Sequence, residues 1–169
     1  MPAGFSHDEM GAQAAAMTYA AASQRWLYLD DAAVEAAVVA ISTPTAAPRL
    51  AREVLDEVRV ARESLSQTPG RVWWIVRPLA VDVEAFTPER ARVAVWTVTV
   101  LSASDVALPQ SDWTTVTLDL AWHEGDWRVD RTADAPGPTP MLGPRDQPWQ
   151  PEPFDDALAG FERVEVGER

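Results

Sequence analysis

Residues 71–86 read RVWWIVRPLAVDVEAF, and they open the stretch of sequence that decides the fold. Three more segments rich in β-branched and aromatic residues follow: RVAVWTVTVLSA at 92–103, WTTVTLDLAWH at 113–123 and DWRVDRTA at 126–133. Turn residues separate these segments, which is the pattern of consecutive strands joined as hairpins. The sequence therefore predicts a curved antiparallel sheet of four strands.

Alternation along these segments predicts which side chains share a face of the sheet, because successive side chains on a strand point to opposite faces. In the third segment, Val116, Leu118 and Leu120 alternate with Thr117 and Asp119. In the second segment both faces are largely apolar, as is typical of an interior strand. Its two predicted faces are Val93, Val95, Thr97 and Thr99 on one side and Ala94, Trp96, Val98 and Val100 on the other.

Two interruptions are predicted within this region. Pro78 has no backbone N–H to donate to a neighbouring strand, so it is expected at a bulge, a bend or a sheet edge. Residues 104–112, which include Pro109, are predicted to form a loop.

Three helices are predicted before the sheet, over residues 10–29, 32–42 and 46–66. Ser6 and Glu9 have the spacing of a capping box at the start of the first helix. Apolar residues recur at helical spacing along all three segments. We expect these helices to fill the concave side of the sheet.

After the sheet, the composition changes. Residues 134–153 hold seven of the chain's fourteen prolines, which predicts an extended, polyproline-like segment on the surface, with Trp149 anchored in a groove. Residues 154–166 carry apolar side chains at helical spacing and are predicted to form a short terminal helix. We therefore expect a cone-shaped domain over residues 1–133 and a tail over 134–169 packed on the same domain.

The charge and composition exclude several classes of function. The net charge is -12, so a phosphate backbone would repel the chain, and we expect no nucleic-acid partner. The absence of Cys excludes disulfides, thiolate metal ligands and a Cys nucleophile. No run of about 18 apolar residues is present to span a membrane. We expect any membrane anchor to lie upstream of this chain.

The sequence holds few candidates for catalysis. His7 and His123 are its two histidines, and they lack the spacing of a metal site, so we predict neither a metal nor a cofactor. Asp119 is the carboxylate of most interest, with His123 as a second candidate. If Asp119 faces the concave side of the sheet it could act as a general base or pair with Arg92 or Arg77; on the other face it would be solvated or salt-bridged.

The tryptophans of the strands are candidates for contacts with a partner. Trp73 and Trp74 are adjacent, so on a regular strand they point to opposite faces, and one of them must meet a second layer, a partner or solvent. Together with Trp149 they are the predicted interface residues. Lining of a ligand pocket is a second interpretation of the strand tryptophans, although core packing is the commoner role.

The order of three helices and then a curved antiparallel sheet resembles the cone-shaped fold named after nuclear transport factor 2. The chain is similar, more closely, to TcpC-like extracytoplasmic domains of actinobacterial conjugative-element proteins. The stretches that carry this resemblance are GFSHDEMGAQAAAMTYA at 4–20, RARVAVWTVTVL at 90–101, WTTVTLDLAWHEGDWRVD at 113–130, PGPTPMLG at 136–143 and DDALAGFERV at 155–164.

This resemblance implies a noncatalytic assembly or scaffold domain of a conjugation (type IV secretion-like) machine on the extracytoplasmic face of the cell membrane. Its partners would be other proteins of that machine, or further copies of itself in an oligomer. The alternative function is a small-molecule binding protein, or an isomerase or hydrolase of the same cone fold, with Asp119 in the cavity beside Trp96 and Trp122. The alternative location is the cytoplasm. An immunity or phage-encoded accessory protein is a third possibility.

Overall fold

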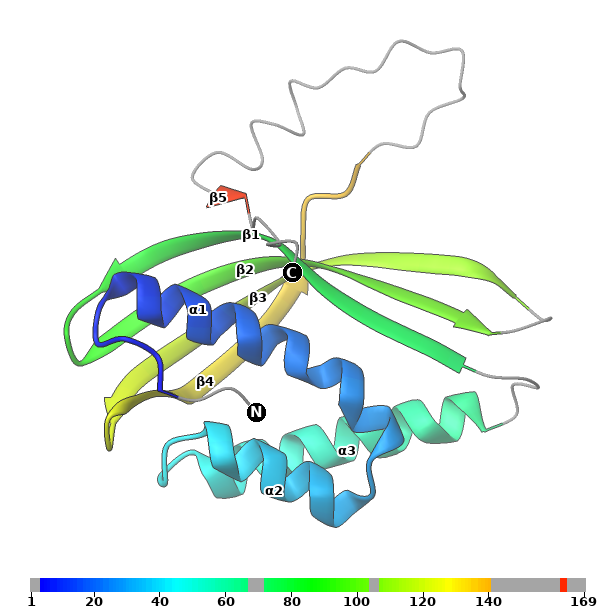
Figure 1. Ribbon diagram of the computed structural model, residues 1–169. Helices are drawn as coiled ribbons and strands as arrows, with labels where there is room; N and C mark the ends of the chain where they lie inside the picture. The colour runs from blue at the N-terminus through cyan, green and yellow to red at the C-terminus, as the bar shows by residue number, and fades with distance from the viewer. Residues whose placement is uncertain (1–3, 67–71, 104–106, 141–161, 164–169) are drawn as a thin grey trace, which may run out of the picture.

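The computed structural model describes residues 4–66, 72–103, 107–140 and 162–163 (Figure 1). These residues form an α+β fold in which three helices precede a curved antiparallel sheet. The elements are α1 (Glu9–Ala20), the 3-10 helix η1 (Ala21–Tyr28), α2 (Asp31–Ile41), α3 (Ala47–Leu65), β1 (Val72–Phe86), β2 (Arg90–Ala103), β3 (Ala107–His123), β4 (Asp126–Pro136) and β5 (Glu162–Arg163).

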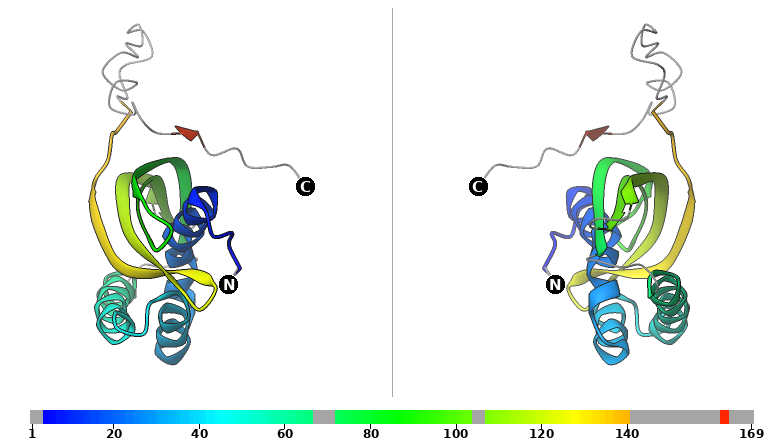
Figure 2. Two further views of the ribbon diagram at one scale, coloured as in Figure 1. Left: turned by 90° about the vertical axis from the view of Figure 1, so that its left-hand side faces the viewer. Right: turned by 90° about the vertical axis from the view of Figure 1, so that its right-hand side faces the viewer.

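The sheet has the strand order β4-β3-β2-β1-β5, and neighbouring strands are antiparallel. It curves around α1, which packs against β1 and β2, while α2 and α3 pack on each other farther from the sheet. Figure 2 shows this curvature from both sides, with all the helices on the concave face. The predicted cone-like α+β arrangement of three helices and a four-stranded curved sheet is confirmed.

The strands follow the predicted pattern with two corrections. Pro78 lies at a shift in the register between β1 and β2, as its missing N–H requires. Strand β3 begins at Ala107, so the predicted loop over 104–112 is wrong from Ala107 onward; pairing of these residues with β2 extends the hairpin. Glu124 and Gly125 form the turn before β4, both with positive φ (51° and 82°), which suits a two-residue hairpin.

The first helix differs from its prediction at both ends. Its N-cap is Asp8, whose Oδ1 accepts the Gly11 N–H at 2.7 Å, and Ser6 only donates its hydroxyl to Asp8. The carboxylate is the stronger acceptor for a backbone N–H at a positive helix end, so it takes the capping role from Ser6. After Ala20 the winding tightens to a 3-10 helix, and the period of 3.6 residues used to predict residues 10–29 no longer applies.

The other two helices agree with their predictions to within one residue at each end. Asp30 caps α2 by accepting the Ala33 N–H at 2.8 Å. Pro48 lies in the first turn of α3, where its missing N–H costs nothing. The apolar stripe of α3, formed by Leu50, Val54 and Val58, is buried. Among the described residues, no helix combines the length and apolarity needed to cross a membrane.

The tail is described only in part. Residues 137–140 cross the outer face of the sheet, where the Gly137 N–H donates to the Trp113 carbonyl at 2.9 Å and the Trp96 indole N–H donates to the Pro138 carbonyl at 3.0 Å. Glu162–Arg163 forms β5 against β1, so the predicted terminal helix is wrong at these two residues. The rest of the predicted surface segment and helix lies outside the described residues.

A set of buried polar contacts, which we call the N-terminal clasp, joins the residues before α1 to the start of β4. Asp126 is 4 % exposed, and its carboxylate accepts the N–H groups of Gly4 (3.1 Å) and Phe5 (3.2 Å). Trp127 is fully buried, and its indole N–H donates to the Ser6 carbonyl at 2.9 Å. The clasp holds the chain start against the core cluster that α1 shares with β2, β3 and β4.

Candidate ligand cavity

A cavity of about 400 Å³ lies on the concave side of the sheet, and we call it the concave-face cavity. Helical residues of its wall come from α1, η1, α2 and α3, and strand residues come from β1 to β4. Its volume falls within the range of small-molecule sites, which is about 300–1,000 Å³. The expectation that the helices fill the concave side completely is therefore wrong.

The sequence explains why space remains here. Ala12, Ala15 and Ala16 of α1 are fully buried, and these small side chains let the helix lie close to the sheet at one end of the concave face. Beyond the end of α1, the strands continue over α3 (Figure 1). On this part of the sheet Thr97 and Thr99 line the cavity, and such short side chains do not reach across to the helices.

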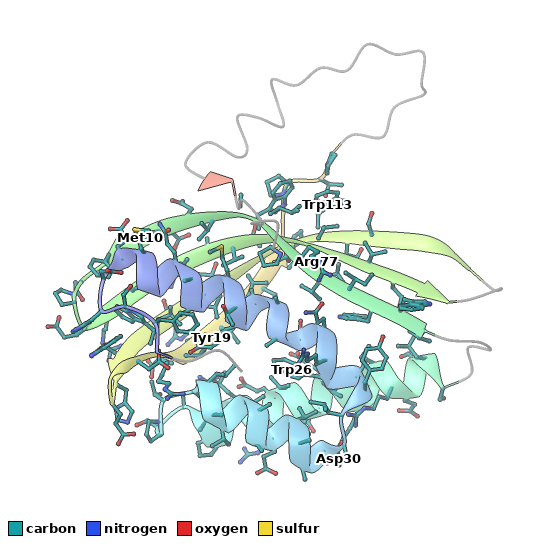
Figure 3. The ribbon with its side chains drawn as sticks, viewed as in Figure 1. Met10, Tyr19, Trp26, Asp30, Arg77 and Trp113 are labelled. Carbon is teal, nitrogen blue, oxygen red and sulfur yellow. The ribbon has the colours of Figure 1, made fainter. Side chains whose placement is uncertain are left out.

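Aromatic side chains form part of the cavity wall. Trp26 from η1 lies between η1 and α3, and Tyr19 from α1 is nearby (Figure 3). The Tyr19 hydroxyl donates to the Trp127 carbonyl at 2.8 Å, and burial, together with the nearby Asp126 carboxylate, raises the pKa of Tyr19 to about 12. Tyr19 therefore stays neutral and serves as a fixed part of the wall.

Trp74 from β1 is part of the wall, and its indole N–H makes no hydrogen bond to the described residues. The indole Nε1 is buried. A buried donor without an acceptor costs about 1–3 kcal/mol relative to a satisfied one.

Three carboxylates line the cavity: Glu57 from α3, Asp112 from β3 and Asp134 from β4. Burial raises the pKa of Glu57, and the negative charges of Asp134 and Glu53 raise it further. Burial also raises the pKa of Asp134. Glu57, Asp112 and Asp134 are all exposed residues, so their carboxyl groups lie at the open edge of the cavity. Across residues 4–66, 72–103 and 107–140, none of the three has a cationic partner within salt-bridge distance.

These raised pKa values give stability a pH dependence. The folded state holds the protons of Glu57 and Asp134 more tightly than the unfolded state, so both carboxyls lower stability as the pH rises through their folded pKa values. We expect Glu57→Gln and Asp134→Asn to raise the melting temperature at pH 7, with a gain that disappears below the ordinary carboxyl pKa of about 4. Glu35→Gln, at an exposed site on α2, is the control and should show no such trend; thermal unfolding at several pH values measures the effect, and equal gains at all pH values would contradict it.

The wall offers binding groups and no evident catalytic pair. Within the described part of the chain, the wall contains no His, Arg or Lys, and its Ser42 hydroxyl donates to the Val38 carbonyl at 2.7 Å. In the part of the chain that the structure describes, no group of three or more His, Asp or Glu side chains could hold a metal ion. General acid–base catalysis needs a base within hydrogen-bond reach of a nucleophile or a substrate proton, and the cavity arranges no such pair.

Asp119 does not line the concave-face cavity. It lies on the opposite face of β3 from the buried Leu118 and Leu120, as the alternation predicted. Its carboxylate is 3.0 Å from Arg92 Nη1 and 3.9 Å from Arg131 Nε, and Arg92 also binds Glu84 at 2.6 Å. The alternative with Asp119 in the cavity is therefore wrong, and the ion pair with Arg92 is the arrangement found.

Neither histidine lies at the cavity. His7 stacks on Trp122 with ring centroids 3.9 Å apart, and its Nε2 is 2.5 Å from the Pro88 carbonyl. His123 lies at the β3–β4 turn, with Nε2 3.9 Å from the carboxylate of Glu124. His7 thus joins the start of α1 to the hairpin turns instead of being merely solvated.

The predicted interface tryptophans occupy different places. Trp73 and Trp74 point to opposite faces, as predicted: Trp74 lines the cavity, and Trp73 is 45 % exposed. Trp149 lies outside the described residues. Trp96 stacks on Trp113 on the outer face, with centroids 5.1 Å apart.

Trp122 packs against the core and not in the cavity. The suggestion that it and Trp96 would line the cavity is therefore wrong. The cavity residues that sequence reasoning missed are Trp26, Glu57, Asp112 and Asp134. Asp112 could have been found from the alternation of β3, because every second residue counted back from Leu118 faces the same side. This required assigning residues 107–112 to the strand.

Comparison with known proteins gives one family. The chain belongs to the family described as Domain of unknown function (DUF8175), whose model matches residues 1–146. No curated protein and no solved structure matches the chain. The matched range covers the helices, strands β1 to β4 and every residue of the concave-face cavity.

Proposed function

We propose that this DUF8175 chain is a noncatalytic binding domain that assembles a conjugation (type IV secretion-like) machine on the extracytoplasmic face of the cell membrane, as the resemblance to TcpC-like domains implies. It acts through protein–protein contacts, with itself or with other proteins of the machine. The family carries no described function, so this proposal depends on the resemblance and on the surface and cavity of the fold.

One observation favours binding over catalysis: among the described residues, the wall places no His, Arg or Lys beside its carboxylates to complete an acid–base pair. The catalytic candidate from the sequence, Asp119, is held in an ion pair on the outer face. A general base must be free to accept a proton from a bound substrate. A carboxylate already neutralised by an exposed arginine on the wrong face of the sheet does not meet this requirement.

Exposed apolar side chains supply candidate contact surface. Trp73 is 45 % exposed on β1, and Tyr28 is 60 % exposed beside it, since the Tyr28 hydroxyl donates to the Val72 carbonyl and accepts the Trp74 N–H. Partly exposed aromatic residues are enriched at protein interfaces and carry a large share of their binding energy. We take the surface formed by Trp73 and Tyr28 as the contact site of this proposal.

The proposal is tested with Trp73→Ser. We expect the wild-type chain to form an oligomer or a complex with the products of neighbouring genes, and Trp73→Ser to weaken that association at least about tenfold, the effect typical of a central interface aromatic. Met10→Ser is the control, because Met10 is 77 % exposed on α1 and does not belong to the contact site. Size-exclusion chromatography with light scattering is the measurement; a wild-type monomer that binds none of these proteins would contradict the proposal.

A second candidate function, a small-molecule binding protein of the same fold, is favoured by the concave-face cavity. The cavity has the volume, the largely apolar wall and the few polar groups that such sites share. Its polar groups include several hydroxyls and the carboxylates of Glu57, Asp112 and Asp134, and Asp119 is not among them. If no apolar probe binds the wild-type chain, this second candidate function is wrong.

A further inference from the structure

The carboxylates of the concave-face cavity have no cationic partner among the residues that the structure describes. Glu57, Asp112 and Asp134 come from three different elements, and neither the wall nor the salt bridges of the described residues supply a cation to them. Glu57 and Asp134 both line the cavity, and besides burial the negative charge of Asp134 raises the pKa of Glu57, so the two carboxylates repel each other. A positive charge placed between them would relieve this repulsion.

A metal ion does not fit as that positive charge. Calcium and magnesium need several oxygen ligands within about 2.6 Å of one point. In the part of the chain that the structure describes, no three carboxylates or imidazoles converge in this way. The carboxylates are therefore spread along a wall, which suits an extended organic molecule.

The remaining wall residues suit the same organic cation. Trp26 and Trp74 present indole rings, and Tyr19 presents a phenol ring that stays neutral. Aromatic faces attract ammonium groups, with about 0.5–2 kcal/mol for each contact. The aliphatic residues of the wall, such as Leu50 and Val58, would bury an apolar body.

From this arrangement we propose that the concave-face cavity binds a small amphipathic amine: an apolar body held in the cavity and one protonated amino group at the Glu57 and Asp134 carboxylates. This inference rests on the second candidate function, a small-molecule binding protein, and is independent of the assembly function. It identifies the class of ligand as cationic, in contrast to a neutral lipid or an anionic metabolite.

The test uses three fluorescent probes that share one apolar body. Dansylcadaverine carries a protonated primary amine, its N-acetyl derivative is neutral, and a dansyl amino acid with a chain of similar length carries a carboxylate. We expect the wild-type chain to bind the amine about tenfold or more tightly than the acetylated probe, the ratio that one cation–π contact and one partly buried ion pair would give. The carboxylate probe should bind most weakly.

Variants locate the effect. The double variant Glu57→Gln with Asp134→Asn should reduce the preference for the amine to nearly one while leaving binding of the acetylated probe unchanged. Asp119→Asn, which removes a carboxylate from the outer face, should keep the preference. Ala61→Phe, which adds a ring to the cavity wall, should weaken binding of all three probes.

The possible failures are distinguishable. If the acetylated probe binds wild type as tightly as the amine, or if the preference persists in the double variant, the proposed ligand class is wrong while small-molecule binding stands. If none of the three probes binds wild type, both the ligand class and the small-molecule function fall.

Discussion

Replacing Trp127 with alanine is expected to lower the free energy of unfolding by about 3–5 kcal/mol, the range for removing a buried aromatic side chain. Trp127 is fully buried, and its ring contacts Trp122 and Phe86 with centroids 5.3 Å and 5.9 Å away. Its indole N–H also donates to the Ser6 carbonyl, so the substitution removes one bond of the N-terminal clasp. Urea denaturation followed by circular dichroism measures the loss.

Two further variants keep this prediction testable if the alanine variant fails to fold. Trp127→Phe retains most of the ring but loses the hydrogen bond to Ser6, and should cost about 1–3 kcal/mol. Trp113→Ala is the control, because Trp113 is half-buried on the outer face, away from the helices (Figure 3). If Trp113→Ala lowers the free energy of unfolding as much as Trp127→Ala does, the core is not centred where the structure places it.

Replacing Asp126 with alanine should have the second largest effect, about 2–4 kcal/mol, because the buried carboxylate accepts the backbone N–H groups of Gly4, Phe5 and Trp127, and these would lose their partner. The same change leaves Arg128, whose Nη2 is 3.8 Å from the Asp126 carboxylate, without that ion pair. Residues 4–8 should then detach from β4. Amide hydrogen exchange of Gly4 and Phe5 reports this detachment directly.

Asp126→Asn separates the charge from the hydrogen bonds. Asparagine keeps one acceptor oxygen, so we expect a loss of stability between wild type and Asp126→Ala. Asp82→Asn on β1 is the matched control, since Asp82 is half-exposed and has no part in the clasp. Unchanged exchange at Gly4 and Phe5 in Asp126→Ala would mean that the clasp does not hold the chain start.

The elements that sequence reasoning predicted well are those specified by local chemistry. Leu50, Val54 and Val58 mark the buried stripe of α3, and Pro78 marks the register shift in β1, because each follows from a single residue or a short period. The alternation of β3 also places the side chain of Asp119 on the other face of the sheet from Leu118. Since Leu118 is in the core, that alternation was sufficient to exclude Asp119 from the concave face.

The errors arose where two local signals competed or where tertiary pairing decided the outcome. Ser6 and Asp8 both can cap a helix, and in the structure the Asp8 carboxylate takes this role while Ser6 donates its hydroxyl to Asp8. Residues 107–112 contain Pro109 and Ser111, which favour a loop, but pairing with β2 keeps them in a strand. The clasp at Asp126 joins residues more than 120 positions apart, so no local pattern reveals it.

The cavity could not be predicted, because its volume depends on the distance between the helices and the sheet. The periodicity of α3 shows which face of the helix is buried, but it does not give the distance between that face and β2. Two of the cavity carboxylates, Asp112 and Asp134, fell in segments predicted to be a loop and a tail. The assignment of a binding site to the concave face therefore depends on the three-dimensional arrangement.

The central claim, that the concave-face cavity is a preformed binding site, is tested most directly by the indole N–H signals of the tryptophans in a two-dimensional ¹H–¹⁵N NMR spectrum. On titration with dansylcadaverine, the signals of Trp74 and Trp26 should shift, Trp74 most, and those of Trp113 and Trp96 on the outer face should stay in place. Shifts confined to Trp73, Trp96 or Trp113, with Trp74 and Trp26 unmoved at saturation, would contradict it.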